Sequence, residues 1–187
     1  MQQKTQHSRV IVGVLSLAVL VGAALTSSPA QADTGAGPYY VPPAWDRTLP
    51  SAARFMALTN MASAAVLDRE TGLVWEKSPA ITQMSWDAAR DICANLTTGN
   101  RKGWRLPSMP ELASLVDPSV ASPGPVLPPG HPFSNVQSGT YLTFWSATMI
   151  AGFPGPWIVR FTDGRVYDEG LSERAWCVRG GMNADAY

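Results

Sequence analysis

The sequence predicts one α+β domain in which short helices alternate with β-hairpins. Apolar residues at helical spacing are confined to two short stretches, 86–96 and 109–116, and a serine that can cap a helix precedes each stretch. Short apolar runs around turn residues occur at 66–75 and 157–167, a pattern typical of hairpins. Two long helices or a helix bundle are not indicated.

The first 32 residues indicate an export signal. Lys4 and Arg9 precede an apolar run over 10–25, and Ala30-Gln31-Ala32 has the pattern of a cleavage site. An uncleaved membrane anchor is the alternative, but a bilayer requires about 20 apolar residues, more than this run contains. We therefore expect cleavage after Ala32, no membrane span in the mature chain, and a periplasmic or extracellular location.

The mature chain has the length and charge of an ordinary globular domain. Without the signal, 12 basic residues stand against 14 acidic ones, a balance that argues against a nucleic-acid partner. Residues 33–53 are rich in proline and glycine and are expected to form a leader, 54–183 the domain, and 184–187 a tail. The sequence does not indicate an oligomeric state.

Cys93 and Cys177 are the only cysteines in the chain. Export places them in an oxidising compartment, where such a pair is expected to form a disulfide. A catalytic or redox pair would call for C-x-x-C spacing or a nearby histidine, and the sequence has neither. The helix over 86–96 turns Cys93 inward on one apolar face, together with Ala89, Ile92 and Leu96.

The segment over 103–112 is the most informative motif of the chain. Ser108 followed by Glu111 forms a capping box at the start of the second helix, and proline suits the first turn. Arg105 is expected to tie loops together, not to contact a ligand. We predict that this segment and the first hairpin supply core contacts from the following residues: Trp75, Trp104, Leu106 and Leu112.

Seven strands are expected from the apolar runs and turns, two in each of two hairpins and three others. The first hairpin pairs 66–68 with 73–75 around Gly72, and Asp68 and Thr71 are expected to bond to turn amides, in preference to a metal. Asp163-Gly164 predicts a two-residue type I′ turn in the second hairpin. Further strands are expected at 54–58, 141–148 and 175–179.

The segment over 118–139 contains six prolines and is expected to be irregular. Such a loop either carries a binding surface or covers the core. It includes His131, the one histidine of the mature chain, for which a metal or catalytic role is not expected.

The order of these blocks resembles the Lcl C-terminal domain family, also called domain of unknown function 1566. The resemblance covers roughly 54–183 and rests on the following residues: Asp68, Thr71, Gly72, Trp75, Cys93, Trp104, Arg105, Pro107, Ser108, Glu111, Trp145 and Cys177. It implies a C-type-lectin-like fold with two short helices, a mostly antiparallel twisted sheet, long loops, and a disulfide from the first helix to the last strand.

The family takes its name from a bacterial collagen-like adhesin whose domain of this type is associated with binding sulfated glycosaminoglycans. This chain lacks a Gly-X-Y repeat, so adhesion through a collagen trimer is not expected. It also lacks the Glu-Pro-Asn, Gln-Pro-Asp and Trp-Asn-Asp triplets of calcium-dependent lectins, so no metal or other cofactor is expected.

The resemblance therefore favours a non-enzymatic exported binding module for a glycan or a surface protein. Candidate ligand contacts are Trp157, Arg160, Arg165 and Arg174. Two alternatives are a structural envelope protein without a small ligand and, less favoured, a hydrolase that uses a carboxylate pair from Asp163, Asp168 and Glu169.

Overall fold

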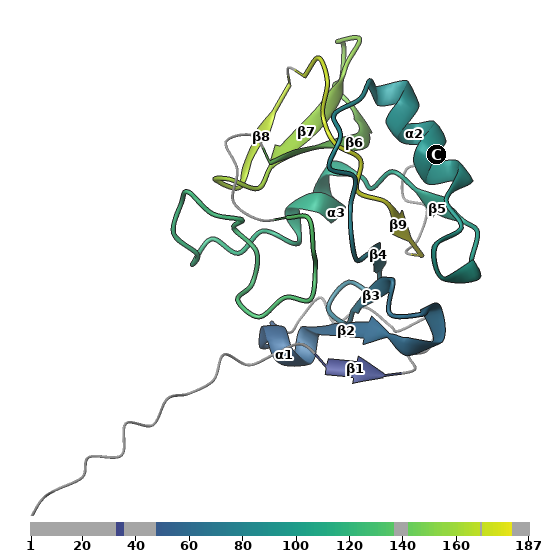
Figure 1. The fold of residues 1–187 in the computed structure, drawn as a ribbon. Helices are drawn as coiled ribbons and strands as arrows, with labels where there is room; N and C mark the ends of the chain where they lie inside the picture. Colours follow the sequence, from purple (N-terminus) through teal and green to yellow (C-terminus); the bar gives the residue numbers. More distant parts are fainter. Residues whose placement is uncertain (1–32, 36–47, 137–141, 169, 181–187) are drawn as a thin grey trace, which may run out of the picture.

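A computed structural model describes residues 33–35, 48–136, 142–168 and 170–180 (Figure 1). The described part contains two sheets and a small number of short helices, so the predicted α+β class is confirmed. All strand pairs except one are antiparallel.

The larger sheet has the strand order β1-β2-β3-β4-β9-β5. Its strands are β1 (Asp33–Gly35), β2 (Phe55–Leu58), β3 (Ala65–Asp68), β4 (Val74–Glu76), β9 (Val178–Arg179) and β5 (Trp104–Arg105). β1 pairs in parallel with β2, so three residues of the predicted leader add an edge strand to the domain. The hairpin of β3 and β4 forms as predicted, and Gly72 adopts a φ of 72° in its turn.

The smaller sheet has the order β6-β7-β8, with β6 (Thr143–Met149), β7 (Pro156–Arg160) and β8 (Arg165–Tyr167). The predicted two-residue turn between β7 and β8 is wrong. Arg160 pairs with Arg165, which leaves the four residues 161–164 in the loop. Phe161 leaves the ladder because its side chain is fully buried against Phe144, at 5.6 Å between ring centroids.

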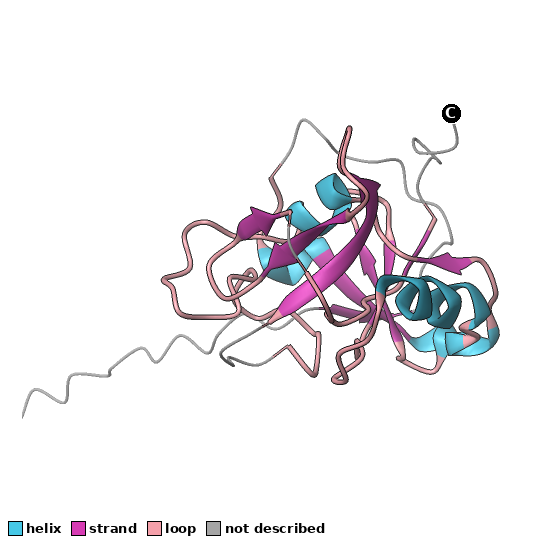
Figure 2. Ribbon diagram, turned by 90° about the horizontal axis from the view of Figure 1, so that it is seen from above, coloured by secondary structure: helices cyan, strands magenta, loops and turns pink. Residues whose placement is uncertain are grey.

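Helix α2 (Trp86–Asn95) lies to one side of the sheets, apart from α1 (Ser51–Arg54) and α3 (Met109–Ala113) (Figures 1 and 2). The Ser85 side chain caps α2 by accepting from the Ala88 amide. Ala89 and Cys93 are buried as predicted, but Ile92 is 45% exposed. The predicted face was therefore too wide, because only the narrow stripe over the larger sheet is covered.

The capping box predicted at α3 is present. Ser108 Oγ accepts from the Glu111 amide at 3.4 Å, and Glu111 Oε2 accepts from the Ser108 amide at 2.8 Å. The α-helix itself ends at Ala113, earlier than the predicted run to residue 116, although Leu115 is still fully buried. Two 3₁₀ turns, η1 (Thr59–Met61) and η2 (Thr98–Asn100), complete the helical elements.

The buried apolar side chains form two clusters, and alternate residues of the segment 175–178 belong to one or the other. Trp176 is at the centre of the first cluster, with its ring centroid 5.0–5.5 Å from those of four aromatic side chains: Trp75, Phe133, Phe144 and Phe161. The second cluster contains the disulfide and Trp104, Leu106 and Trp145. The predicted core residues of the first hairpin and the 103–112 segment are all buried.

Within the described residues 114–136, no helix or strand occurs, as predicted for the proline-rich loop. Val126, Leu127, Phe133 and Val136 are nevertheless buried, each less than 8% exposed. The loop was expected either to carry a binding surface or to cover the core. The burial of these side chains supports the second interpretation, because the loop covers the aromatic cluster. His131 packs beside Phe133, and burial lowers the pKa of its imidazole.

The disulfide between Cys93 and Cys177 is formed, as predicted, with the two Cα atoms 5.3 Å apart. Both cysteines are buried in the second cluster. The bond joins α2 to the residue directly before β9 across a sequence separation of 84 residues. It therefore closes most of the domain into one covalent loop.

Replacing both cysteines with alanine should lower the free energy of unfolding by about 2–5 kcal/mol, because the unfolded chain regains the freedom of a long loop. Denaturant titration measures the change. Wild-type protein with its disulfide reduced should unfold at a denaturant midpoint similar to that of the double-alanine variant. Equal midpoints for oxidised and reduced wild-type protein would show that the disulfide does not stabilise the fold.

Replacing Ser108 with alanine should cost about 0.5–2 kcal/mol, because the Glu111 amide loses its partner in the first turn of α3. The measurement is the denaturant midpoint, compared at an unchanged slope of the free energy of unfolding against denaturant concentration. Ser172→Ala, at an exposed serine outside the helices, is the matched control and should leave the midpoint unchanged. An equal effect of the two changes would show that the cap is irrelevant.

Candidate functional site

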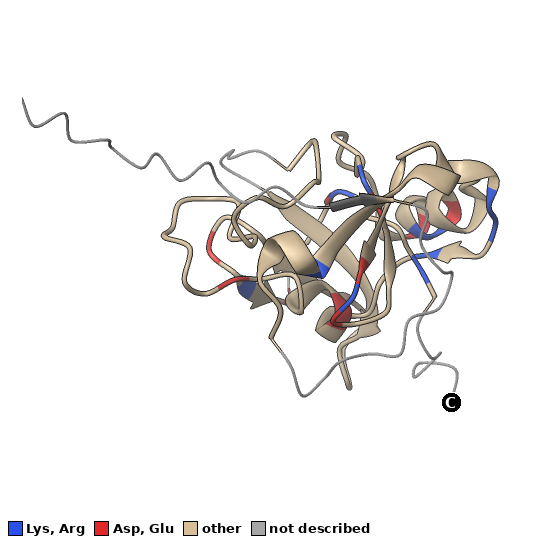
Figure 3. Ribbon diagram, turned by 90° about the horizontal axis from the view of Figure 1, so that it is seen from below, with Lys and Arg blue, Asp and Glu red and all other residues tan. Residues whose placement is uncertain are grey.

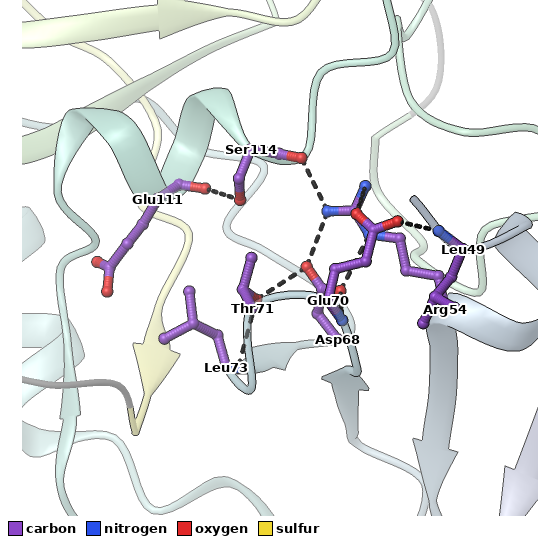
Figure 4. A network of polar contacts seen from close by, with 8 residues as sticks. All are labelled: Leu49, Arg54, Asp68, Glu70, Thr71, Leu73, Glu111 and Ser114. Carbon is purple, nitrogen blue, oxygen red and sulfur yellow. Dashed lines mark hydrogen bonds and ion pairs between the residues drawn. The ribbon is translucent and has the colours of Figure 1, made fainter. Parts of the chain in front are cut away.

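A buried ion pair between Arg54 and Asp68 joins the end of α1 to the end of β3 (Figure 4). The guanidinium donates from Nε to Oδ1 at 2.9 Å and from Nη2 to Oδ2 at 2.8 Å. The carboxylate also accepts from Thr71 Oγ1 at 2.9 Å and from the Glu70 amide at 3.0 Å. With four donors on its two oxygens, Asp68 serves the structure of the hairpin turn.

The same guanidinium reaches two further elements. Arg54 Nη1 lies 2.9 Å from Glu70 Oε2, and Nη2 donates to the Ser114 carbonyl at 2.8 Å. Thr71 Oγ1 accepts from the Leu73 amide at 3.3 Å, so the turn is also closed from within. The network therefore ties α1, the first hairpin and the end of α3 together.

Arg105 ties loops together in the 103–112 segment. Its guanidinium makes a two-pronged contact with Glu111, with N–O distances of 2.7 and 2.6 Å, and Nη2 also donates to the Gly180 carbonyl at 2.9 Å. The Glu111 carboxylate simultaneously caps α3. One carboxylate thus fixes α3 against β5 and the chain that follows β9.

Arg160 is held within the β7–β8 hairpin. Its Nε donates to Asp163 Oδ1 at 2.9 Å, its Nη2 contacts Asp163 Oδ2 and the Tyr167 hydroxyl, and its guanidinium carbon lies 4.3 Å from the Tyr167 ring centroid. The hydrogen bond from Arg160 is the main cause that lowers the pKa of Asp163 to about 2. Asp163 is therefore ionised at neutral pH and is not a proton donor.

The four candidate contacts do not all lie on one face. Arg165 is the cross-strand partner of Arg160, so these two side chains share a face of the smaller sheet; the Arg165 side chain is 74% exposed, with Nε 3.6 Å from Asp163 Oδ2. Trp157 is half-buried and three residues from Arg160, so the two side chains leave β7 on opposite faces. Arg174 follows a different segment, and its Nε is buried without a hydrogen-bond partner in the described part of the chain.

The carboxylates expected in the hydrolase alternative do not form a described pair. Asp163 is engaged by Arg160, and Glu169 lies outside the described residues. Two glutamates that sequence reasoning missed have perturbed acidity: burial raises the pKa of Glu76 to about 7 and raises that of Glu173 as well. Among the described residues, no three His, Cys, Asp or Glu side chains gather as a metal site.

We call the residues Arg101, Lys102 and Arg179 the cationic edge. Sequence reasoning missed it, because residues 100–103 resemble a simple connector. Lys102 is exposed, and the two arginines are partly exposed. Arg179 Nε donates to the Lys102 carbonyl at 2.7 Å, so β9 and the loop before β5 meet there although 77 residues separate them. The signal that could have found it is the Arg101-Lys102 pair, but its partner Arg179 required the fold.

Breaking the Arg54–Asp68 pair should be strongly destabilising. Asp68→Asn should cost about 3–5 kcal/mol, because the buried guanidinium loses the more deeply buried of its two counter-charges and keeps only Glu70. The free energy of unfolding measures the effect. Asp87→Asn is the control, because Asp87 faces Arg90 at 3.7 Å on the exposed surface of α2, where ion pairs contribute little. A similar response of both variants would contradict the assigned role.

Comparison with known proteins adds one match. The family model of the Lcl C-terminal domain matches residues 64–179, which is more than half of the chain. No curated protein and no solved structure matches the chain, so the C-type-lectin-like fold implied by the resemblance stays a prediction. In the described residues, no helix is long and apolar enough to cross a bilayer. The block order, the disulfide and the family match together lead to one conclusion: the chain belongs to the Lcl C-terminal domain family.

Proposed function

We propose that the protein is an exported, non-enzymatic binding module whose ligand is a sulfated polysaccharide. Family membership supports a module of this kind, since the resemblance implies sulfated glycosaminoglycans as ligands. The predicted signal and the buried disulfide both support export to an oxidising compartment, periplasmic or extracellular.

The observation that carries the proposal is the internal use of the carboxylates in the sequence motifs. Asp68 accepts four hydrogen bonds, Glu111 holds Arg105 and caps α3, and Asp163 holds Arg160. A general acid or base needs a proton that it can exchange with substrate. Carboxylates engaged in this way support binding by the surface over catalysis.

An anionic ligand fits the surface charges that remain. Lys102 is exposed, and the Arg165 side chain is 74% exposed, so cationic groups reach solvent from the loop before β5 and from β8. Guanidinium and ammonium groups recognise sulfate oxygens directly, without a bridging metal ion. A surface protein with acidic side chains is the second ligand class that the same chemistry allows.

A structural envelope role is the alternative, and one observation favours it. The long proline-rich segment buries its apolar side chains over the aromatic cluster and does not present them to solvent. Burial of these side chains stabilises the domain without a ligand.

Wild-type protein should bind heparin, used as the sulfated probe, in the presence of excess EDTA, because no step of recognition uses a metal. Binding should weaken as ionic strength rises, since salt screens exposed charges over about 10 Å at 0.1 M. Surface plasmon resonance measures both effects.

Dextran, which is uncharged, is the matched control and should not bind. Loss of heparin binding in EDTA would refute metal independence. Failure to bind heparin at low salt would remove the proposed ligand class and leave the structural alternative.

A further inference from the structure

We infer that the loop joining β6 to β7 is a membrane-contacting tip, which inserts apolar side chains into the surface of a zwitterionic lipid bilayer. The apolar tip is defined as residues 149–157 and has the sequence Met-Ile-Ala-Gly-Phe-Pro-Gly-Pro-Trp. It lies at the end of the molecule opposite β1 (Figure 1). Lipid contact here goes beyond the polysaccharide ligand proposed above and uses none of the cationic groups.

The apolar tip exposes large apolar side chains to solvent. Phe153 is 61% exposed, whereas every other aromatic residue in the described part of the chain is buried or half-buried. Met149, at the end of β6, is 47% exposed. A Cβ placed on Gly152 would meet no atom within 4 Å, so the turn projects into open space. Moving this surface out of water is favourable.

The side chains of the apolar tip gather on one face. A Cβ placed on Gly155 would lie 3.9 Å from Ile150 Cδ1 and 4.0 Å from Phe153 Cδ1, so these two side chains lie together over Gly155. β7 begins at the next residue, and residues two apart in an extended segment share a face. Trp157, which is half-buried, therefore follows on the same side. The result is one apolar strip that runs from the turn toward the domain.

The apolar tip belongs to the longest uncharged stretch of the sequence. No Asp, Glu, Lys or Arg occurs in residues 118–159, although 15% of the chain is charged. This stretch is tan in Figure 3, where blue and red mark the charged residues. Charged side chains are costly within a bilayer. The first charge along β7 is Arg160, which its strand position places about 10 Å behind Trp157.

The order of side chains from the turn inward matches the polarity gradient of a bilayer surface. Phe153 comes first, at the turn. Trp157 comes next, and tryptophan is enriched where hydrocarbon meets the headgroups. Arg160 lies behind both, at a depth where water is present. A tip with this order can enter the boundary of headgroups and acyl chains without carrying a charge into it.

The backbone of the apolar tip is hydrogen-bonded within itself. The Ile150 amide donates to the Gly155 carbonyl at 2.8 Å, and the Phe153 amide donates to the Ile150 carbonyl at 3.1 Å. Backbone groups without a partner are costly in lipid. Because these bonds are internal, the turn keeps them when it leaves water.

A lipid surface fits this composition better than a protein partner. Residues 149–157 contain no hydroxyl, amide or charged side chain. Protein interfaces surround an apolar centre with a polar rim and carry hydrogen bonds across their area. A projecting apolar turn offers few such bonds, and insertion into lipid does not require them.

The charges beside the base of the apolar tip do not favour anionic lipid. Asp168 is exposed and follows Tyr167, the ladder partner of Ile158, so it lies near the start of β7. Arg90 flanks β6 from α2, with its guanidinium carbon 4.6 Å from the ring centroid of Trp86, whose indole donates to the β6 backbone. These opposite charges give no net attraction to an anionic surface. We therefore expect apolar insertion to drive binding, without weakening by salt.

The test compares two double variants. Ile150→Ser/Phe153→Ser should weaken binding to phosphatidylcholine vesicles by roughly tenfold or more, because two side chains no longer gain from leaving water. Ile81→Ser/Ile92→Ser removes two side chains outside the apolar tip, 65% and 45% exposed. This control should bind within about twofold of wild type, as surface changes elsewhere have small effects. Co-flotation with vesicles measures binding. Thermal unfolding checks the fold, and Phe153→Ser alone serves if the first double variant unfolds.

Backbone amide shifts of wild-type protein on titration with dodecylphosphocholine micelles give a second readout, which should centre on residues 149–157. No binding of wild type to the vesicles, or equal loss in both double variants, would overturn the inference. Loss of binding at about 1 M salt, where charges are screened within about 3 Å, would do the same.

Sedimentation without lipid tests the other occupant, a second copy of the chain. A wild-type dimer that the Ile150/Phe153 variant cannot form would overturn lipid insertion and assign the apolar tip to self-association. Heparin binding by that variant should equal that of wild type. The proposed polysaccharide ligand therefore stands or fails separately from lipid contact.

Discussion

The alternation of side chains along residues 174–179 is the constraint on which the rest of the structure depends. Ala175 and Cys177 enter the cluster that contains the disulfide, whereas Trp176 and Val178 enter the aromatic cluster. The same segment pairs with β4 and β5 through β9 and bridges to β6 through Arg174. A slip of one residue would exchange the two sets of side chains, so packing of both clusters fixes a single register. The disulfide then holds that register covalently.

Ion pairs hold together elements that strand pairing does not connect. Arg54 with Asp68 joins α1 to β3, Arg105 with Glu111 joins β5 to α3, and Arg160 with Asp163 joins β7 to the turn that follows it. Such short elements bury too few backbone bonds to set their own orientation, and a fork of guanidinium donors imposes both distance and plane on its partner. Desolvation offsets much of the attraction in a buried pair, so geometric specificity is the more secure consequence. The first pair is the most buried of the three, and it links α1 to the family motif.

Local signals made much of this fold predictable. A serine cap, a capping box and a glycine turn act within four residues, so α2, α3 and the first hairpin could be placed from the sequence. The β7–β8 turn could not, because burial of Phe161 overrides the local preference of Asp163-Gly164. The surroundings of the candidate binding residues were harder to predict than the fold. Arg160 resembles a surface cation until its bonds to Asp163 and Tyr167 are known, and Arg179 joins Lys102 only after the chain has folded across 77 positions.

Net charge was therefore a poor guide to where an anion could bind. A slight excess of acidic residues over residues 33–187 hides an uneven distribution, because the motif carboxylates are placed beside arginines in the interior junctions. Those pairs cancel locally and contribute little field at the surface.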